Sequence, residues 1–270
     1  MAIPHKNDPI GIFDSGIGGM TVARAITSAL PNENLVYFGD TAHFPYGDKS
    51  TAAIQAYAVK ICQVLLQQKC KVIVIACNSA SASAYDLVKE YVGSKVKVVN
   101  VIEPTVNYVG KHFGNKKIGV IGTKRTVDSN VYKLHVDLLE KNIELKSLAT
   151  PLLAPMIEEG FYKNELSDAV IAEYLSNKLL NEIEALILGC THYPLIKEQI
   201  DSFYKNSVEV LDSASIVAEH LKNVLSDNGL LNDHFLAHRF FVSDITSYFE
   251  KSATLFFGKK VDLQLYKLWE

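Results

Sequence analysis

The sequence predicts an α/β fold with two pseudo-symmetric βαβ-type domains, mostly parallel sheets and a cleft between them. Apolar runs rich in β-branched residues alternate with helical patterns along the chain, as in βαβ units. The plan of the first half recurs in the second, since residues 117–121 echo residues 9–13 at an offset of 108 positions. A chain of 270 residues is long enough for two domains. We place these at residues 1–103 together with 211–270, and at residues 104–210.

The first half is expected to alternate strands with helices. Residues 72–75, Val-Ile-Val-Ile, have no polar break, which is typical of a strand buried on both faces. Residues 51–69 carry an apolar stripe at helical spacing. The remaining strands are expected at residues 9–13, 35–38 and 96–102, and the remaining helices at 20–30 and 82–91.

The second half repeats this alternation and is followed by a tail. Its strands are expected at residues 117–121, 145–149, 184–189 and 208–211, and its helices at 129–141 and 166–181. The tail is expected to form a helix at 216–225, a loop at 228–238, a strand at 238–242, a helix at 244–257 and a packed end at 261–269.

Composition excludes several classes of function. The formal charge is −3 and no run of Lys or Arg is present, so we expect no nucleic acid and no acidic membrane surface as a partner. No apolar run approaches the ~20 residues that span a bilayer. The amino end has no apolar signal core, and the four cysteines have no CxxC spacing, so reduced thiols in the cytoplasm are expected.

A glycine-rich turn, Asp14-Ser-Gly-Ile-Gly-Gly, follows the first strand. Its spacing does not match GxGxxG, and no GK[ST] follows, so a dinucleotide site or a P-loop is poorly supported. Glycines still let backbone N–H groups approach an anion closely. Asp14 stands where it could either cap the next helix or enter a site.

Two cysteines occupy equivalent places in the two halves. Cys77 and Cys190 each follow an apolar strand, at the sheet edge where α/β proteins bind ligands. The start of a helix there favours a thiolate. If the halves face each other, both thiols enter one cleft, and two acid–base groups on opposite faces of one carbon are what inversion of configuration requires. Their neighbours in the sequence plan are mostly polar: Asp14, Ser15, Asn78, Ser79, Thr123, Thr191 and His192.

These groups suggest different roles in the proton transfers and in charge stabilisation. Asp14 and His192 would tune or relay protons, each beside one cysteine. Backbone N–H groups at helix starts would stabilise a developing carbanion and a substrate carboxylate.

Five sequence blocks resemble the signature blocks of the glutamate racemases. They are residues 14–19 (DSGIGG), 39–42 (GDTA), 45–47 (PYG), 76–80 (ACNSA) and 189–194 (GCTHYP), and the resemblance runs from about Pro9 to the carboxyl end. It implies a cofactor-independent enzyme that interconverts L- and D-glutamate and supplies D-glutamate for peptidoglycan, with its active site in the cleft.

The resemblance also implies roles for individual residues. Cys77 and Cys190 are the two catalytic acid–base groups, serving D- and L-glutamate respectively, and Asp14, His192 and Glu158 assist them. Glu158 is chosen over the adjacent Glu159 by motif register alone. The substrate contacts implied are Asp14, Ser15, Tyr46, Gly47, Asn78, Ser79, Thr191 and His192, together with Asp40, Thr123 and Thr126.

Other interpretations stay open at this point. A related racemase acting on aspartate or a hydantoin would share the two cysteines, and an amino-acid-binding protein with two α/β halves would share the fold. A metal site formed by the two cysteines with His192 and Asp14 has poor zinc spacing, so no metal is expected. His192 could bond to backbone, Glu158 could be a solvated charge, and Tyr46 could serve packing only. Cys62 and Cys70 are expected to be structural, and a homodimer is compatible with the sequence.

Overall fold

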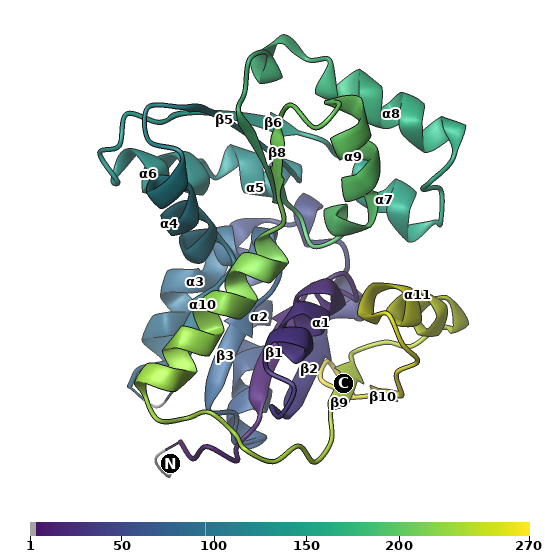
Figure 1. The fold of residues 1–270 in the computed structure, drawn as a ribbon. Coiled ribbons are helices and arrows are strands. Elements are labelled where there is room, and N and C mark those ends of the chain that lie inside the picture. The colour runs from purple at the N-terminus through teal and green to yellow at the C-terminus, as the bar shows by residue number, and fades with distance from the viewer. Residues whose placement is uncertain (1–3, 95) are drawn as a thin grey trace.

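The computed structural model describes residues 4–94 and 96–270, and its strands form two separate sheets (Figure 1). The strands are β1 (Ile10–Asp14), β2 (Leu35–Gly39), β3 (Val72–Ile75), β4 (Lys97–Asn100), β5 (Lys117–Gly122), β6 (Glu144–Ala149), β7 (Ala185–Gly189), β8 (Glu209–Leu211), β9 (Arg239–Val242) and β10 (Leu263–Leu265). The sheet orders are β10-β9-β2-β1-β3-β4 and β6-β5-β7-β8. All strand pairs among the described residues are parallel. The shared order, β2-β1-β3-β4 in one sheet and β6-β5-β7-β8 in the other, confirms the predicted two-fold repetition of an α/β plan.

The helices cover both sheets. They are α1 (Met20–Ala29), α2 (Thr51–Gln67), α3 (Asn78–Val92), α4 (Ile102–His112), α5 (Lys124–Asp128), α6 (Val131–Asp137), α7 (Leu153–Glu158), α8 (Glu165–Leu175), α9 (Lys197–Phe203), α10 (Ser213–Asp227) and α11 (Ser247–Phe257). Short 3₁₀ turns lie at Thr41–His43, Tyr46–Asp48, Lys178–Leu180 and Tyr193–Ile196. No helix in the described ranges is long and apolar enough to cross a bilayer.

The predicted strand at residues 96–102 is too long, because a helix that the sequence analysis did not predict begins inside it. The Asn100 side chain accepts hydrogen bonds from the backbone N–H groups of Ile102 and Glu103, both at 2.8 Å. These bonds satisfy the first two N–H groups of α4, and β4 ends at Asn100. Pro104 lies in the first turn of the helix, where its missing N–H has no consequence.

The helix predicted at residues 129–141 is present but shorter, since α6 spans Val131–Asp137. A further short helix that the sequence analysis did not predict, α5, precedes it, and Asn130 between them has a φ of 55° in the left-handed region that Asn tolerates. The helix predicted at 166–181 likewise ends at Leu175. Conversely, α3 begins at Asn78, earlier than predicted, because the sulfur of Cys77 accepts a hydrogen bond from the Ala80 N–H at 3.4 Å and caps it.

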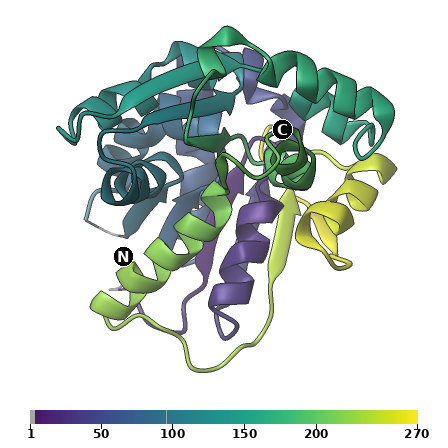
Figure 2. The ribbon, with the colours of Figure 1, turned by 45° about the horizontal axis from the view of Figure 1, so that its top comes forward.

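Alternate residues of the central strands pack into two different apolar cores. Ile12 and Val74 pack on the face covered by α1, while Phe13 and Ile75 pack on the face covered by α2 and α3. The first of these cores continues into the smaller sheet through residues such as Ile187. Helix α10 then returns beside α1, as both ribbon views show (Figure 1, Figure 2).

The two sheets meet near the carboxyl ends of their central strands. Phe13 pairs with Ile75 in one sheet and Gly122 with Gly189 in the other, so Asp14 and Cys77 end neighbouring strands, as do Thr123 and Cys190. Hydrogen bonds cross between the halves near these ends. The Thr21 hydroxyl donates to the Thr191 carbonyl at 2.9 Å, and the hydroxyls of Ser79 and Thr123 are 2.9 Å apart.

Candidate active site

A cavity of about 150 Å³ lies between the two sheets and receives side chains from both. It brings together ten of the residues that the sequence analysis selected: Ser15, Tyr46, Gly47, Cys77, Asn78, Ser79, Thr123, Cys190, Thr191 and His192. Both cysteines therefore face one small space. They are 6% and 7% exposed, and both are free thiols.

Four predicted residues lie behind the cavity wall rather than on it. Asp14 and Asp40 are completely buried, and Glu158 contacts His192. The Thr126 hydroxyl lies 3.1 Å from that of Thr123. These residues contact the cavity lining and not the cavity itself.

Cys77 lies at the start of α3, and its surroundings keep it protonated. Burial and the charge of Asp14 raise the pKa of its thiol to about 12, and hydrogen bonds with Ala80 and Ser15 offset only part of this. The thiol donates to the Ser15 hydroxyl at 3.7 Å. The effect of the helix start, which was expected to favour a Cys77 thiolate, is thus outweighed by desolvation.

Cys190 has a different partner. Its sulfur lies 3.6 Å from Nδ1 of His192, and Nε2 of the same ring bonds to Oε1 of Glu158. Burial lowers the pKa of His192, but the contacts with Cys190 and Glu158 outweigh burial and raise it to about 10. An imidazolium at this place stabilises negative charge on the adjacent sulfur.

The surroundings of His192 and Glu158 bear on two open interpretations. The His192 ring bonds to side chains and makes no side-chain cap to the turn that follows it. Glu158 is buried against this ring and is therefore not a solvated charge, while the neighbouring Glu159 is exposed.

Gly18 makes room for the His192 ring. A Cβ atom on Gly18 would lie 2.4 Å from Cε1 and 2.6 Å from Nδ1 of His192. The glycine-rich turn after β1 therefore allows close packing against the other half of the molecule.

Asp14 is a buried carboxyl that lies close to the residues neighbouring Cys77 and Cys190. Its Oδ2 accepts a hydrogen bond from the Gly16 N–H at 3.0 Å, and it does not cap α1, which begins after Gly19 without a side-chain cap. Burial raises its pKa, while the charge of His192 partly opposes this. It can therefore hold or exchange a proton close to the cavity.

Several residues that complete the site were not selected from the sequence. Phe44, Pro45, Lys124, Thr150, Pro151 and Tyr193 also line the cavity. Thr150 follows β6 at the same sheet edge as Cys190, so the strand-end rule could have found it. Tyr132, whose hydroxyl donates to Asn78 Oδ1 at 2.8 Å, lies 54 positions away and had no sequence signal.

The site contains no evident metal centre. Within residues 4–94 and 96–270, no group of three or more His, Cys, Asp or Glu side chains is arranged to hold a metal ion.

Comparisons with known proteins agree with the geometry. The family model described as Asp/Glu/Hydantoin racemase matches residues 18–221. The glutamate racemase of Chlorobaculum parvum is 41% identical over 261 residues, which is 95% of each chain. The crystal structure of glutamate racemase from Francisella tularensis in complex with D-glutamate is 40% identical and covers 98% of this chain and 99% of that one, with a TM-score of 0.91. The isoform RacE1 of glutamate racemase from Bacillus anthracis is 33% identical, with coverages of 97% and 98% and a TM-score of 0.92. The chain therefore belongs to the family of Asp/Glu/Hydantoin racemases, in which the relatives it matches over nearly its whole length are glutamate racemases, isomerases that act on an amino acid.

Proposed function

We propose that this chain interconverts L- and D-glutamate in the cytoplasm without a cofactor, with Cys77 and Cys190 as the two acid–base groups, and so supplies D-glutamate for peptidoglycan. The observation that carries the proposal is that these two thiols, from equivalent strand ends of two similar sheets, line the same small cavity. The likeness to a glutamate racemase that binds D-glutamate supports the choice of substrate.

The reaction needs one proton transfer on each face of the α-carbon. One thiolate removes the Cα proton and becomes a thiol, and the C–H electron pair remains on the substrate as a carbanion. The opposite thiol then donates its proton to the other face and becomes the thiolate. The two sulfurs have thereby exchanged protonation states, and the substrate has changed configuration.

The surroundings of the two thiols differ. Cys77, with a pKa of about 12, is the thiol that donates. The sulfur of Cys190 lies 3.6 Å from Nδ1 of His192, which is placed to exchange a proton with it. The family pattern assigns Cys190 to the L-enantiomer and Cys77 to the D-enantiomer. Asp14 and Glu158 then position or exchange protons for the two halves of the reaction.

The substrate's carboxylates meet donors from both sheets. The first backbone N–H groups of α3 at Asn78 and Ser79 suit a carboxylate, because a helix start carries partial positive charge. The hydroxyls of Ser15, Thr123 and Thr191 supply further donors around the cavity.

The decisive experiment follows circular dichroism and Cα hydrogen exchange in deuterated water with L- and D-glutamate. We expect racemisation by the wild-type chain and none by Cys77→Ser or Cys190→Ser, each of which should fail selectively with one enantiomer when only proton abstraction is required. Cys62→Ala, at a buried thiol outside the cavity, is the control and should stay active. Near-normal turnover of either serine variant would contradict the two-base mechanism.

The same assay separates the alternatives. Racemisation of aspartate or a hydantoin without that of glutamate would assign the chain to another substrate of the family. Binding of glutamate without exchange would indicate an amino-acid-binding protein.

A homodimer is part of this proposal. Leu134 and Leu138 lie one helical turn apart at α6 and are 58% and 78% exposed, so a partner could cover them. Sedimentation equilibrium of the wild type and of Leu138→Lys tests this: a monomer in both would remove the dimer from the proposal.

A further inference from the structure

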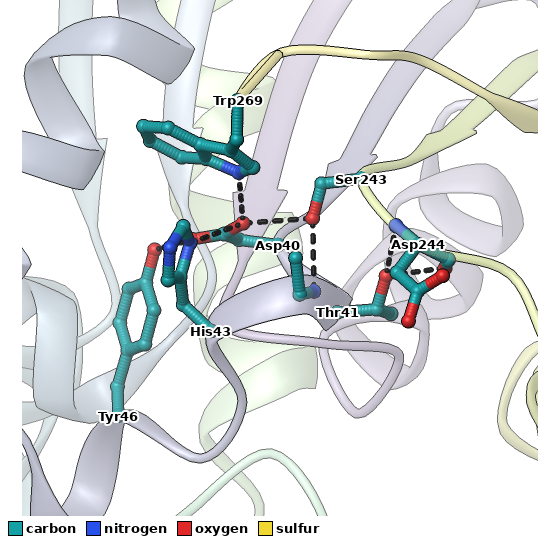
Figure 3. Close-up of polar contacts among 8 residues, drawn as sticks. Asp40, Thr41, His43, Tyr46, Ser243, Asp244 and Trp269 are labelled. Atoms are coloured by element: carbon teal, nitrogen blue, oxygen red, sulfur yellow. Dashed lines mark hydrogen bonds and ion pairs between the residues drawn. The ribbon is translucent and has the colours of Figure 1, made fainter.

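Asp40 is the centre of a buried polar cluster that joins three distant parts of the chain (Figure 3). It follows β2 and is completely buried. Its Oδ2 accepts from the Tyr46 hydroxyl at 2.6 Å, and its Oδ1 accepts from the Ser243 hydroxyl and from Trp269 Nε1, both at 2.8 Å. His43 Nδ1 lies 3.0 Å from Oδ2. Both carboxylate oxygens thus accept hydrogen bonds from protein donors.

Trp269 brings the carboxyl-terminal tail to this cluster. Its ring meets the His43 ring edge to face at 4.5 Å between centroids and the Tyr57 ring at 5.3 Å, and Lys60 Nζ lies 5.5 Å from its centroid. The preceding residue, Leu268, also anchors the tail, because its side chain is buried. The tail therefore packs against α2 and the loop after β2, which are distant from it in the sequence.

Tyr46 connects the Asp40 cluster to the cavity. It is 1% exposed, and it lines the cavity together with the next residue, Gly47. The wall is tightly fitted, because a Cβ on Gly47 would lie 3.1 Å from Cβ of Thr123 on the opposite sheet. A small shift of Tyr46 would therefore alter the space that the substrate occupies.

We propose that the carboxyl-terminal tail is a positioning element of the active site, in which Trp269, acting through Asp40, holds Tyr46 and Gly47 in the conformation that binds the substrate. Asp40 is accordingly a positioning residue and not a substrate ligand. The inference rests on the proposed racemase function for the identity of the substrate.

The test compares the steady-state kinetics of Trp269→Phe, Ser243→Ala and the double variant with glutamate. Phe keeps most of the ring packing and removes only the N–H donor. Because loosening one wall weakens substrate binding while the cysteines and His192 stay in place, KM should rise about tenfold with kcat within about twofold, the size expected for losing one hydrogen bond to a charged group. The double variant should show much less than the product of the two single effects, since both donors act on one oxygen.

Lys267→Ala is the matched control in the same tail, since Lys267 is exposed and its ion pair is with Glu270. It should leave KM unchanged. A KM for Trp269→Phe within about twofold of the wild type, with or without a lower thermal midpoint, would overturn the inference, because the tail would then be only structural.

The outcome stays separable from that of the proposed function. If the wild-type chain does not racemise glutamate, the proposed function fails, and Kd for D-glutamate, measured by calorimetry on the same variants, decides the inference by the same tenfold criterion. Absence of D-glutamate binding by the wild type overturns both.

Discussion

The contact between Gly18 and His192 allows a sharp test of how the two halves build the site. Gly18 has a φ outside the left-handed region, so alanine introduces no backbone strain there. The added Cβ would lie 2.4 Å from His192 Cε1, about 1 Å short of the 3.4 Å at which ordinary contact begins. It would also lie 2.6 Å from the Thr191 hydroxyl. The imidazole, or the whole edge of the smaller sheet, must therefore move by about this amount.

A displacement of that size breaks the geometry on which Cys190 depends. His192 is held on one side by Cys190 at 3.6 Å and on the other by Glu158, so it cannot retreat and keep both contacts. Misplacement of a catalytic group by about 1 Å lowers rates by about 10²-fold, or ~2.7 kcal/mol of transition-state stabilisation. We expect kcat/KM of Gly18→Ala to fall by about this factor in both directions of racemisation.

The assay is circular dichroism with each enantiomer, with far-ultraviolet spectra to verify the fold. Gly114→Ala is the control, because the Cβ added there would meet the Lys141 carbonyl oxygen at an ordinary 3.7 Å. If kcat/KM of Gly18→Ala stays within about threefold of the wild type, the close packing of His192 is not what aligns Cys190, and the reasoning fails.

Two further predictions concern charge. His192, with a pKa of about 10, is an imidazolium below that pH and loses its proton above it, so wild-type kcat/KM should fall as pH rises through about 10. His192→Asn should be slower and lack this alkaline limb, whereas the exposed His112→Asn should keep it. At the opposite edge of the larger sheet, the buried Lys71 lies 2.6 Å from Glu33 Oε2. Lys71→Met should lower the free energy of unfolding in urea by about 3–5 kcal/mol, because it leaves a buried carboxylate without its partner. Lys133→Met, at a half-exposed pair with Asp137, should change it by less than about 1 kcal/mol.

Each of these has a clear contrary outcome. An alkaline limb that persists in His192→Asn would mean that another group titrates there. Cys77 is not that group, since its thiol has a pKa of about 12. Equal stability losses for Lys71→Met and Lys133→Met would show that burial adds nothing to the ion pair.

The parts of the fold that follow local apolar patterns could be predicted closely. The β-branched run at Val72–Ile75 forms a buried strand, and Ala185–Gly189 repeats it in the other sheet. Errors occurred where one residue redirects the backbone: Asn100 starts an unpredicted helix, and the left-handed Asn130 separates α6 from α5, a short helix that was not predicted. Such effects depend on a single hydrogen bond or one left-handed residue, and periodicity does not register them.

The sequence by itself determined the α/β class, the two-fold plan and the pairing of Cys77 with Cys190 at equivalent strand ends, because alternating apolar runs and strand-end motifs are local properties of the chain. Only the tertiary structure decided how those thiols differ. It placed Cys190 against His192 and Glu158 and buried Cys77 beside Asp14. It also placed Asp40 outside the cavity, hydrogen-bonded to Trp269, which is 229 positions away. Proton affinity and positioning depend on burial and on charges brought together by folding, and these are long-range consequences of packing that no single stretch of sequence contains.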